Sequence, residues 1–149
     1  MYNKYMNIQT KCDFLKTEFL LTQQQMDKYD QLSTTIKAWA ITLWAASTGW
    51  AFQVNRREVF LLSIVIILMF WFFDALNKTF RQDYKKRRDE VSEALSHFFQ
   101  TDTLPPSTIS PRLPLHRRAD IIRSFLVLHI ALPYFILTLI SFLLYMKIF

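Results

Sequence analysis

Glycine and cysteine are almost absent from this chain, which has 149 residues but only one of each. A chain with one glycine lacks the Gly-rich loops that cradle phosphates, and it lacks the turn residues of a β-rich fold. One cysteine excludes an intrachain disulfide framework and any zinc or iron–sulfur site built from several cysteines. We therefore expect an all-α fold in a chain long enough for one domain.

Signatures of catalysis are also missing. The sequence contains no GxSxG, no HExxH and no pair of aspartates within an apolar segment. Cys12 has no evident base beside it, and His97 and His116 are isolated from other chemistry-bearing residues. We expect no enzymatic activity, no cofactor and no bound metal.

Apolar residues are abundant, at 52% of the chain with 16% aromatic, and they are gathered in three uncharged blocks. The blocks comprise residues 38–55, 59–73 and 124–146. A bilayer core of ~30 Å requires about 20 helical residues. The third block is long enough, the second reaches this length if its helix continues to Lys78, and the first does so if its polar ends are counted. The sequence therefore predicts an all-α integral membrane protein with three transmembrane helices.

A soluble bundle with three buried helices is the alternative to this prediction. Each helix of such a bundle would carry a polar stripe with a period of 3.6 residues. Residues 59–73 show no such stripe. The membrane interpretation is therefore the stronger of the two.

The basic residues predict the orientation. Fifteen Lys and Arg fall in residues 1–37 and 76–123, against three in the first loop and at the C-terminal end. The positive-inside rule places the first two segments in the cytoplasm and Phe149 outside the inner membrane. Residues 1–35 lack the apolar core of a signal peptide, so we expect the first span to act as an uncleaved signal-anchor.

The cytoplasmic segments are expected to form a helical layer. Residues 12–36 carry apolar side chains at helical spacing, and this helix either runs into the first span or bends onto the bilayer surface. Residues 76–99 carry a similar stripe, which would pack on the N-terminal helix or on a neighbouring subunit. The first stripe consists of Leu15, Phe19, Met26, Tyr29 and Ile36, and the second of Leu76, Phe80, Tyr84, Val91, Leu95 and Phe98.

Four of the five prolines lie in residues 101–118, which predicts an extended connector because proline disrupts helix interiors. The expected organisation is a cytoplasmic amphipathic helix (1–36), a transmembrane hairpin (37–78), a cytoplasmic extension of the second helix (79–100), a Pro-rich linker (101–121) and a third transmembrane helix (122–149).

A cluster of basic residues follows the second apolar block. Such a juxtamembrane cluster attracts anionic lipid, and it also serves as a topology determinant or a contact for a protein partner. Nucleic acid is not expected as a partner, because no nucleic-acid-binding fold surrounds the cluster. The cluster consists of Lys78, Arg81, Lys85, Lys86, Arg87 and Arg88.

Two ionisable residues in the apolar blocks are candidates for a pore or an ion path. His129 lies four residues before Pro133, where proline leaves a backbone carbonyl without its helical donor. The alternative is a neutral histidine that bonds to another helix. Asp74 lies at the end of the second block, either in an acidic ring that faces a pore or in a pair with Lys78 one turn later.

One face of the first apolar block carries small residues that step by four, three and four. Small residues at this spacing allow two membrane helices to approach closely, so we predict that this face mediates helix packing in a homo-oligomer. The stripe consists of Ala38, Thr42, Ala45 and Gly49.

The order of parts, with its cytoplasmic helix, short membrane hairpin and basic helical extension, resembles the small membrane effectors of bacterial anti-phage systems. These include SLATT-like proteins and effectors associated with CRISPR or cyclic nucleotides. The resemblance covers about residues 25–98, from KYDQLSTTIKAWAITLW to KKRRDEVSEAL, and the third span departs from the two-span pattern. It implies an oligomer that breaches or depolarises the inner membrane when a cytoplasmic partner signals infection.

Three functions are consistent with these features. The first is a non-enzymatic oligomeric effector that permeabilises the membrane. The second is a membrane anchor or accessory subunit for a protein partner. The third is a small channel or transporter subunit that uses His129.

Overall fold

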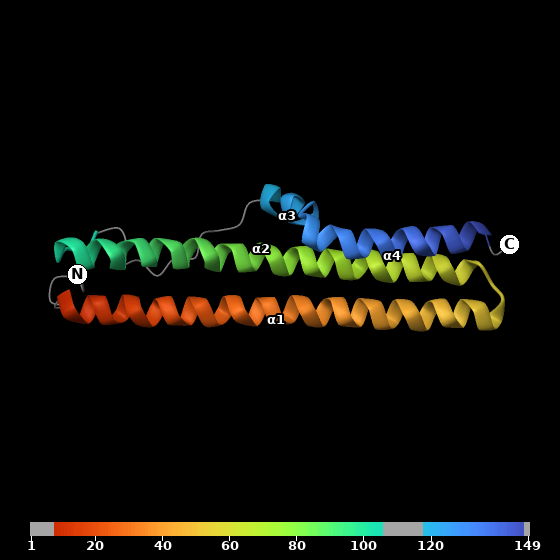
Figure 1. Ribbon diagram of the computed structural model, residues 1–149, viewed down its shortest axis with the longest axis horizontal. Helices are drawn as coiled ribbons and strands as arrows, with labels where there is room; N and C mark the ends of the chain where they lie inside the picture. The colour runs from red at the N-terminus through yellow and green to blue at the C-terminus, as the bar shows by residue number, and fades with distance from the viewer. Residues whose placement is uncertain (1–7, 106–117, 148–149) are drawn as a thin grey trace. The chain divides into compact units, whose positions relative to one another are not determined.

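The structure, a computed structural model, describes residues 8–105 and 118–147, and nearly all of these residues are helical (Figure 1). The helices are α1 (Ile8–Val54), α2 (Glu58–Thr101), α3 (Arg118–Phe125) and α4 (Leu128–Lys147). No strand occurs among these residues. The prediction of an all-α fold is confirmed.

The chain divides into two compact units, and the long helices α1 and α2 contribute to both. Unit 1 contains α1 up to Tyr29 and α2 from Phe80 onward. Unit 2 contains α1 from Asp30, α2 up to Thr79, and all of α3 and α4. The helix predicted over residues 12–36 therefore continues into the first apolar block without a break.

Helices α1 and α2 end at residues that adopt left-handed backbone conformations without being glycine. Asn55, after α1, has φ 51°, and Asp102, after α2, has φ 53°. Asparagine and aspartate tolerate this conformation better than other side chains, so they end helices in a chain that has almost no glycine. The amide of Asp102 donates to the carbonyl of Phe98 at 2.9 Å and closes the end of α2.

The connection between α1 and α2 is short. It comprises residues 55–57, between Val54 and Glu58. The two apolar segments of α1 and α2 thus form a tight antiparallel hairpin within unit 2.

The third apolar block is not a single helix. Helix α3 ends at Phe125, and α4 begins at Leu128 after a turn in which Leu126 N donates to Arg123 O at 3.1 Å. The expectation of one unbroken helix over residues 124–146 is corrected by this break. Helix α4 nevertheless continues through Pro133.

In unit 2, α4 packs on the hairpin of α1 and α2. A buried cluster joins one residue from each hairpin helix with two from α4: Ala40, Ile67, Ile130 and Tyr134. Aromatic side chains extend the cluster, since Trp71 stacks on Tyr134 with 6.4 Å between ring centroids. Figure 1 shows α4 running alongside α2.

Two helices, α2 and α4, are long and apolar enough to cross a membrane. In the most apolar stretch of 18 residues, only 28% of α2 and 17% of α4 is buried. The core helix of a soluble protein is, by contrast, mostly buried. Helix α1 is long, but it has no stretch that is apolar enough to count as a candidate span. Two of the three predicted spans are therefore supported by length and composition.

In unit 1, α1 and α2 lie antiparallel and bury a mixed interface. Cys12, Leu15 and Met26 of α1 and Val91 and Ala94 of α2 are its buried apolar residues. The stripe predicted for α2 contacts α1 at both Val91, which is buried, and Phe80, which is 41% exposed but stacks on Tyr29 with 6.4 Å between ring centroids. The polar residues Asp83 and Arg87 are buried as well, and Arg87 pairs with Glu18 of α1.

Candidate functional site: a buried carboxylate in unit 2

Asp74 is completely buried, and its carboxylate joins three helices of unit 2. Oδ1 accepts a hydrogen bond of 2.6 Å from the Ser33 hydroxyl of α1. Oδ2 lies 3.4 Å from Lys37 Nζ, also of α1, and accepts a bond of 3.3 Å from the Tyr134 phenol of α4. Lys37 Nζ also donates to the Ser33 hydroxyl at 3.1 Å.

This set of contacts balances the buried charge. An isolated carboxylate in an apolar interior is very unfavourable, and it persists there when a cation and hydrogen-bond donors surround it. Lys37, whose side chain is 29% exposed, supplies the cation, and two hydroxyls supply neutral donors. The ion-pair partner of Asp74 is therefore Lys37 of α1, not the neighbour Lys78 that helical spacing suggested.

Lys37, Ser33 and Tyr134 were not identified from the sequence as partners of Asp74. A signal for Lys37 was present, because α1 and α2 form an antiparallel pair about the turn at Asn55. Lys37 lies 18 residues before Asn55 and Asp74 lies 19 after it, so they are opposite each other. No comparable signal locates Tyr134, since a long connection separates α4 from the hairpin.

Other polar side chains of unit 2 also point inward and bond to one another. The hydroxyls of Ser47 and Ser63 are 2.7 Å apart and link α1 to α2. Trp44 Nε1 donates to Ser141 Oγ at 2.8 Å and links α1 to α4. Thr79 Oγ1 donates to Ser124 Oγ at 3.1 Å and links α2 to α3.

His129, the second ion-path candidate, lies in the first turn of α4. Its side chain is exposed, whereas the next residue, Ile130, belongs to the buried cluster. The partners of Asp74 are Ser33, Lys37 and Tyr134, so the structure does not bring the two candidates into one polar group.

The predicted packing stripe lies on the outer surface of unit 2. Its four members are exposed, and apart from the adjacent backbone of α1 no atom of the described residues lies within 4 Å of the position that a Cβ on Gly49 would occupy. The inner face of α1 is formed instead by residues such as Ala40, Ser47 and Ala51. The exposed stripe consists of Ala38, Thr42, Ala45 and Gly49.

The basic cluster of α2 divides by exposure. Lys85 and Lys86 are exposed, Lys78, Arg81 and Arg88 are half-buried, and Arg87 is buried. Arg87 forms a two-point ion pair with Glu18 of α1, at 2.7 Å from Nε and 3.1 Å from the second terminal nitrogen. Hydrogen bonding to Glu18 raises the pKa of Arg87 above its ordinary value, although burial acts against this shift. Arg87 therefore holds unit 1 together and is not part of an exposed lipid-binding surface.

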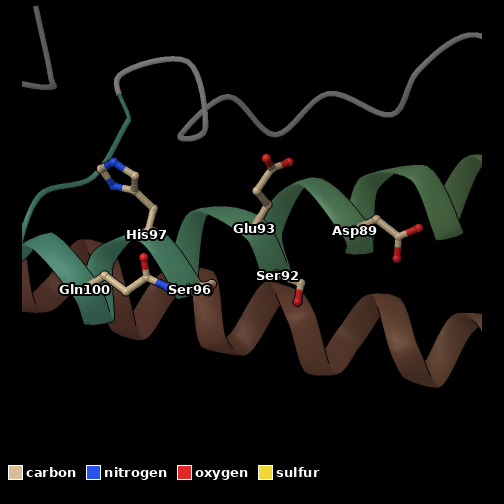
Figure 2. Close-up of a pocket in the computed structure, with 6 residues that line it drawn as sticks. All are labelled: Asp89, Ser92, Glu93, Ser96, His97 and Gln100. Atoms are coloured by element: carbon tan, nitrogen blue, oxygen red, sulfur yellow. The ribbon is translucent and has the colours of Figure 1, made fainter.

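A shallow depression on α2 in unit 1 is lined by Asp89, Ser92, Glu93, Ser96, His97 and Gln100 (Figure 2). It is formed by one face of one helix. His97 Nδ1 lies 3.0 Å from Thr103 O, which holds the segment that follows α2 against this face. Within the described residues, no group of three His, Cys, Asp or Glu side chains could hold a metal ion.

Of the remaining sequence candidates, Cys12 is buried in unit 1 as a free thiol. His116 lies outside the described residues. No protein-family model, curated protein or solved structure matches the chain.

Proposed function

We propose that this protein is a non-enzymatic integral membrane protein that assembles into oligomers and permeabilises or depolarises the inner membrane. The resemblance to small anti-phage effectors suggests bacterial defence as its setting. The observation that carries the proposal is the distribution of side chains in unit 2, where polar groups are buried and large apolar side chains are exposed. The exposed set includes Trp39, Val65, Phe72, Phe135 and Leu143.

This distribution suits lipid as the surrounding solvent. In water, the exposed apolar side chains of α2 and α4 would be a severe liability, whereas in a bilayer they contact acyl chains. Polar groups facing inward would be costly in lipid, and the hydroxyls of Ser33, Ser47 and Ser63, the Trp44 indole and the Asp74 carboxylate each have a partner inside the bundle. Among the described residues, the buried hydroxyl of Thr48 is an exception.

The same geometry supports a third span in α1. Ser33 bonds to Asp74 near one end of the apolar part of α2, and Ser47 bonds to Ser63 near the other. Residues 33–47 of α1 therefore lie beside residues 63–74 of α2. If α2 crosses the bilayer, this part of α1 crosses with it, despite its lower hydropathy.

Three spans, together with the charge distribution, favour a cytoplasmic N-terminus and an external C-terminus. Unit 1, which carries the exposed Lys85 and Lys86, would then lie in the cytoplasm. These two side chains are the members of the basic cluster best placed to attract anionic lipid headgroups.

Self-association is assigned to the outer face of α1. The small residues at 38, 42, 45 and 49 leave room for a second helix, as no other described part of the chain occupies the space next to Gly49. An interface here would leave the internal packing of unit 2 unchanged.

A membrane anchor or accessory subunit for a protein partner is the second candidate function. It is favoured by the large apolar side chains that unit 1 exposes, Phe14, Leu20 and Leu21, which a cytoplasmic partner could cover. A small channel or transporter subunit with His129 in its path is the third.

Expression in bacterial cells tests the proposal. We expect expression of the chain alone to collapse the membrane potential, measured with a potential-sensitive dye. The variant Gly49→Leu, inserted at equal levels, should leave the potential intact. Cells that retain their potential at high levels of inserted wild-type protein would favour the anchor function.

A further inference from the structure

Several polar side chains of unit 2 are buried in its core, whereas others, such as His129 and Thr42, are exposed on its surface. Asp74, Ser47, Ser63 and Ser141 are buried, and the hydrogen bonds described above use their polar atoms within the bundle. The core between them is filled by the cluster around Ile67 and Tyr134. The Asp74 carboxylate is therefore closed off from water and ions in this arrangement.

Helix α4 covers this polar set with few buried residues of its own. Only three of its residues are buried, Ile130, Tyr134 and Ser141. Two of these three make the polar contacts that hold α4, to Asp74 of α2 and to Trp44 of α1. In lipid no hydrophobic effect drives one helix onto another, and single interhelical hydrogen bonds contribute only about 0.6 kcal/mol on average.

We propose that α3 and α4 form a displaceable cover, and that permeabilisation requires this cover to leave the hairpin of α1 and α2. Displacement uncovers the Asp74 carboxylate on the side that Tyr134 occupies and frees the Trp44 indole. Hairpins from several copies then line a hydrophilic path with these groups. This inference rests on the proposed function and adds the step that converts the closed bundle into the conducting form.

The hairpin itself is expected to stay closed during this step. It is held by the Ser47–Ser63 bond and the Ser33–Asp74 bond, and its helices are joined by only three residues. Helix α3 is tied to the hairpin by Thr79–Ser124 and by Trp71 Nε1, which donates to Phe125 O at 3.3 Å. Two of these contacts provide equivalent positions for crosslinks. Ser47–Ser63 lies between α1 and α2, and Thr79–Ser124 lies between α2 and α3.

The test uses two cysteine pairs in a full-length Cys12→Ala background. The pair Thr79→Cys with Ser124→Cys locks α3 to α2, and the control pair Ser47→Cys with Ser63→Cys locks α1 to α2. Short hydroxyl side chains with oxygens 3.1 Å and 2.7 Å apart place the β-carbons within reach of a disulfide. Each variant is reconstituted in vesicles, and ion leak is compared in the oxidised and reduced states.

We expect the oxidised 79–124 variant to lose its leak and to regain it on reduction, whereas the 47–63 variant leaks in both states. Equal leak from both oxidised variants, or loss of leak from both, overturns the inference and leaves the proposed function intact. Absence of leak from the wild-type protein and from both reduced variants overturns the proposed function itself.

A second measurement follows the far end of α4 and requires no crosslink. Ser141 is buried against Trp44, so the thiol of Ser141→Cys should be protected from a water-soluble maleimide in the resting protein. We expect labelling to begin under the conditions that produce leak. Labelling that stays absent while the vesicles leak contradicts displacement of α4.

Discussion

The phenol of Tyr134 donates a hydrogen bond of 3.3 Å to the carboxylate of Asp74, sixty positions earlier in the chain. This bond joins α4 to a hairpin whose own helices meet at the same carboxylate through Lys37. Asp74 is thus the point at which all three long helical segments of unit 2 are connected. The first prediction concerns the balance of charge at this point.

Removal of Lys37 alone should lower the stability of the protein more than removal of both partners of the ion pair. Lys37→Met leaves the Asp74 carboxylate buried without its cation, and breaking such a pair costs about 3–5 kcal/mol. The double variant Lys37→Met with Asp74→Asn removes both charges and should recover most of this loss. Thermal unfolding of the detergent-solubilised protein measures the difference, and a double variant less stable than Lys37→Met would refute the pairing.

The ion pair between Glu18 and Arg87 should stabilise unit 1 in the same way. Arg87 is only 5% exposed in its side chain and Glu18 only 15%. Glu18→Gln should therefore lower stability, by less than the about 3–5 kcal/mol of a wholly unpaired buried charge, because the guanidinium keeps its burial and retains the exposed Glu90, 3.2 Å from Nη1, as counter-ion. The exposed pair Lys16–Asp13 is the matched control, and Asp13→Asn should have no measurable effect. Equal effects from the two substitutions would show that Arg87 is solvated in solution.

Gly49→Leu should abolish self-association without unfolding the bundle. Within the described part of the chain, nothing beyond the adjacent backbone of α1 lies within 4 Å of the added Cβ, so the larger side chain enters open space and separates only a neighbouring copy. Crosslinking in membranes, with helical content as the folding control, measures the effect. Ala46→Leu, also exposed on α1 but outside the stripe, should leave oligomers intact. Persistence of crosslinked oligomers in Gly49→Leu would assign the interface to another surface.

The orientation can be tested at the C-terminal end. Three spans with a cytoplasmic N-terminus place a reporter fused after Phe149 outside the cytoplasm. An enzyme that is active only in an oxidising, external compartment should therefore function there. Activity of a cytoplasmic reporter at the same position would mean that α1 does not cross the membrane, or that the orientation is reversed.

Much of this fold follows from the sequence, and the exceptions have identifiable causes. The all-α class and the apolar segments of α2 and α4 were predicted, because long uncharged runs without glycine leave little other choice. The partner of Asp74 could have been inferred because Lys37 and Asp74 lie nearly the same number of residues, 18 and 19, from the turn at Asn55. The buried position of Arg87 could not be read from its own helix, where it is one of six basic residues, because burial depends on Glu18 on the opposite helix.

The break between α3 and α4 is a second feature without a local signal. Leu126 and Val127 are apolar residues in an apolar run, with neither glycine nor proline nearby to indicate a turn. Tertiary packing fixes the break, since Phe125 O accepts a bond from Trp71 and Val127 packs on the buried cluster. Contacts with α2, far away in the sequence, therefore decide where the helix ends.

Ion flux across vesicles that contain the purified protein tests the central claim most directly. The account predicts that wild-type protein dissipates an imposed potassium gradient, that Gly49→Leu does not, and that Asp74→Asn reduces the preference for cations. His129→Leu in the same assay decides whether His129 lies on the path, because a packing residue leaves the flux unchanged. A gradient that persists in vesicles with correctly inserted, oligomeric wild-type protein would contradict the account.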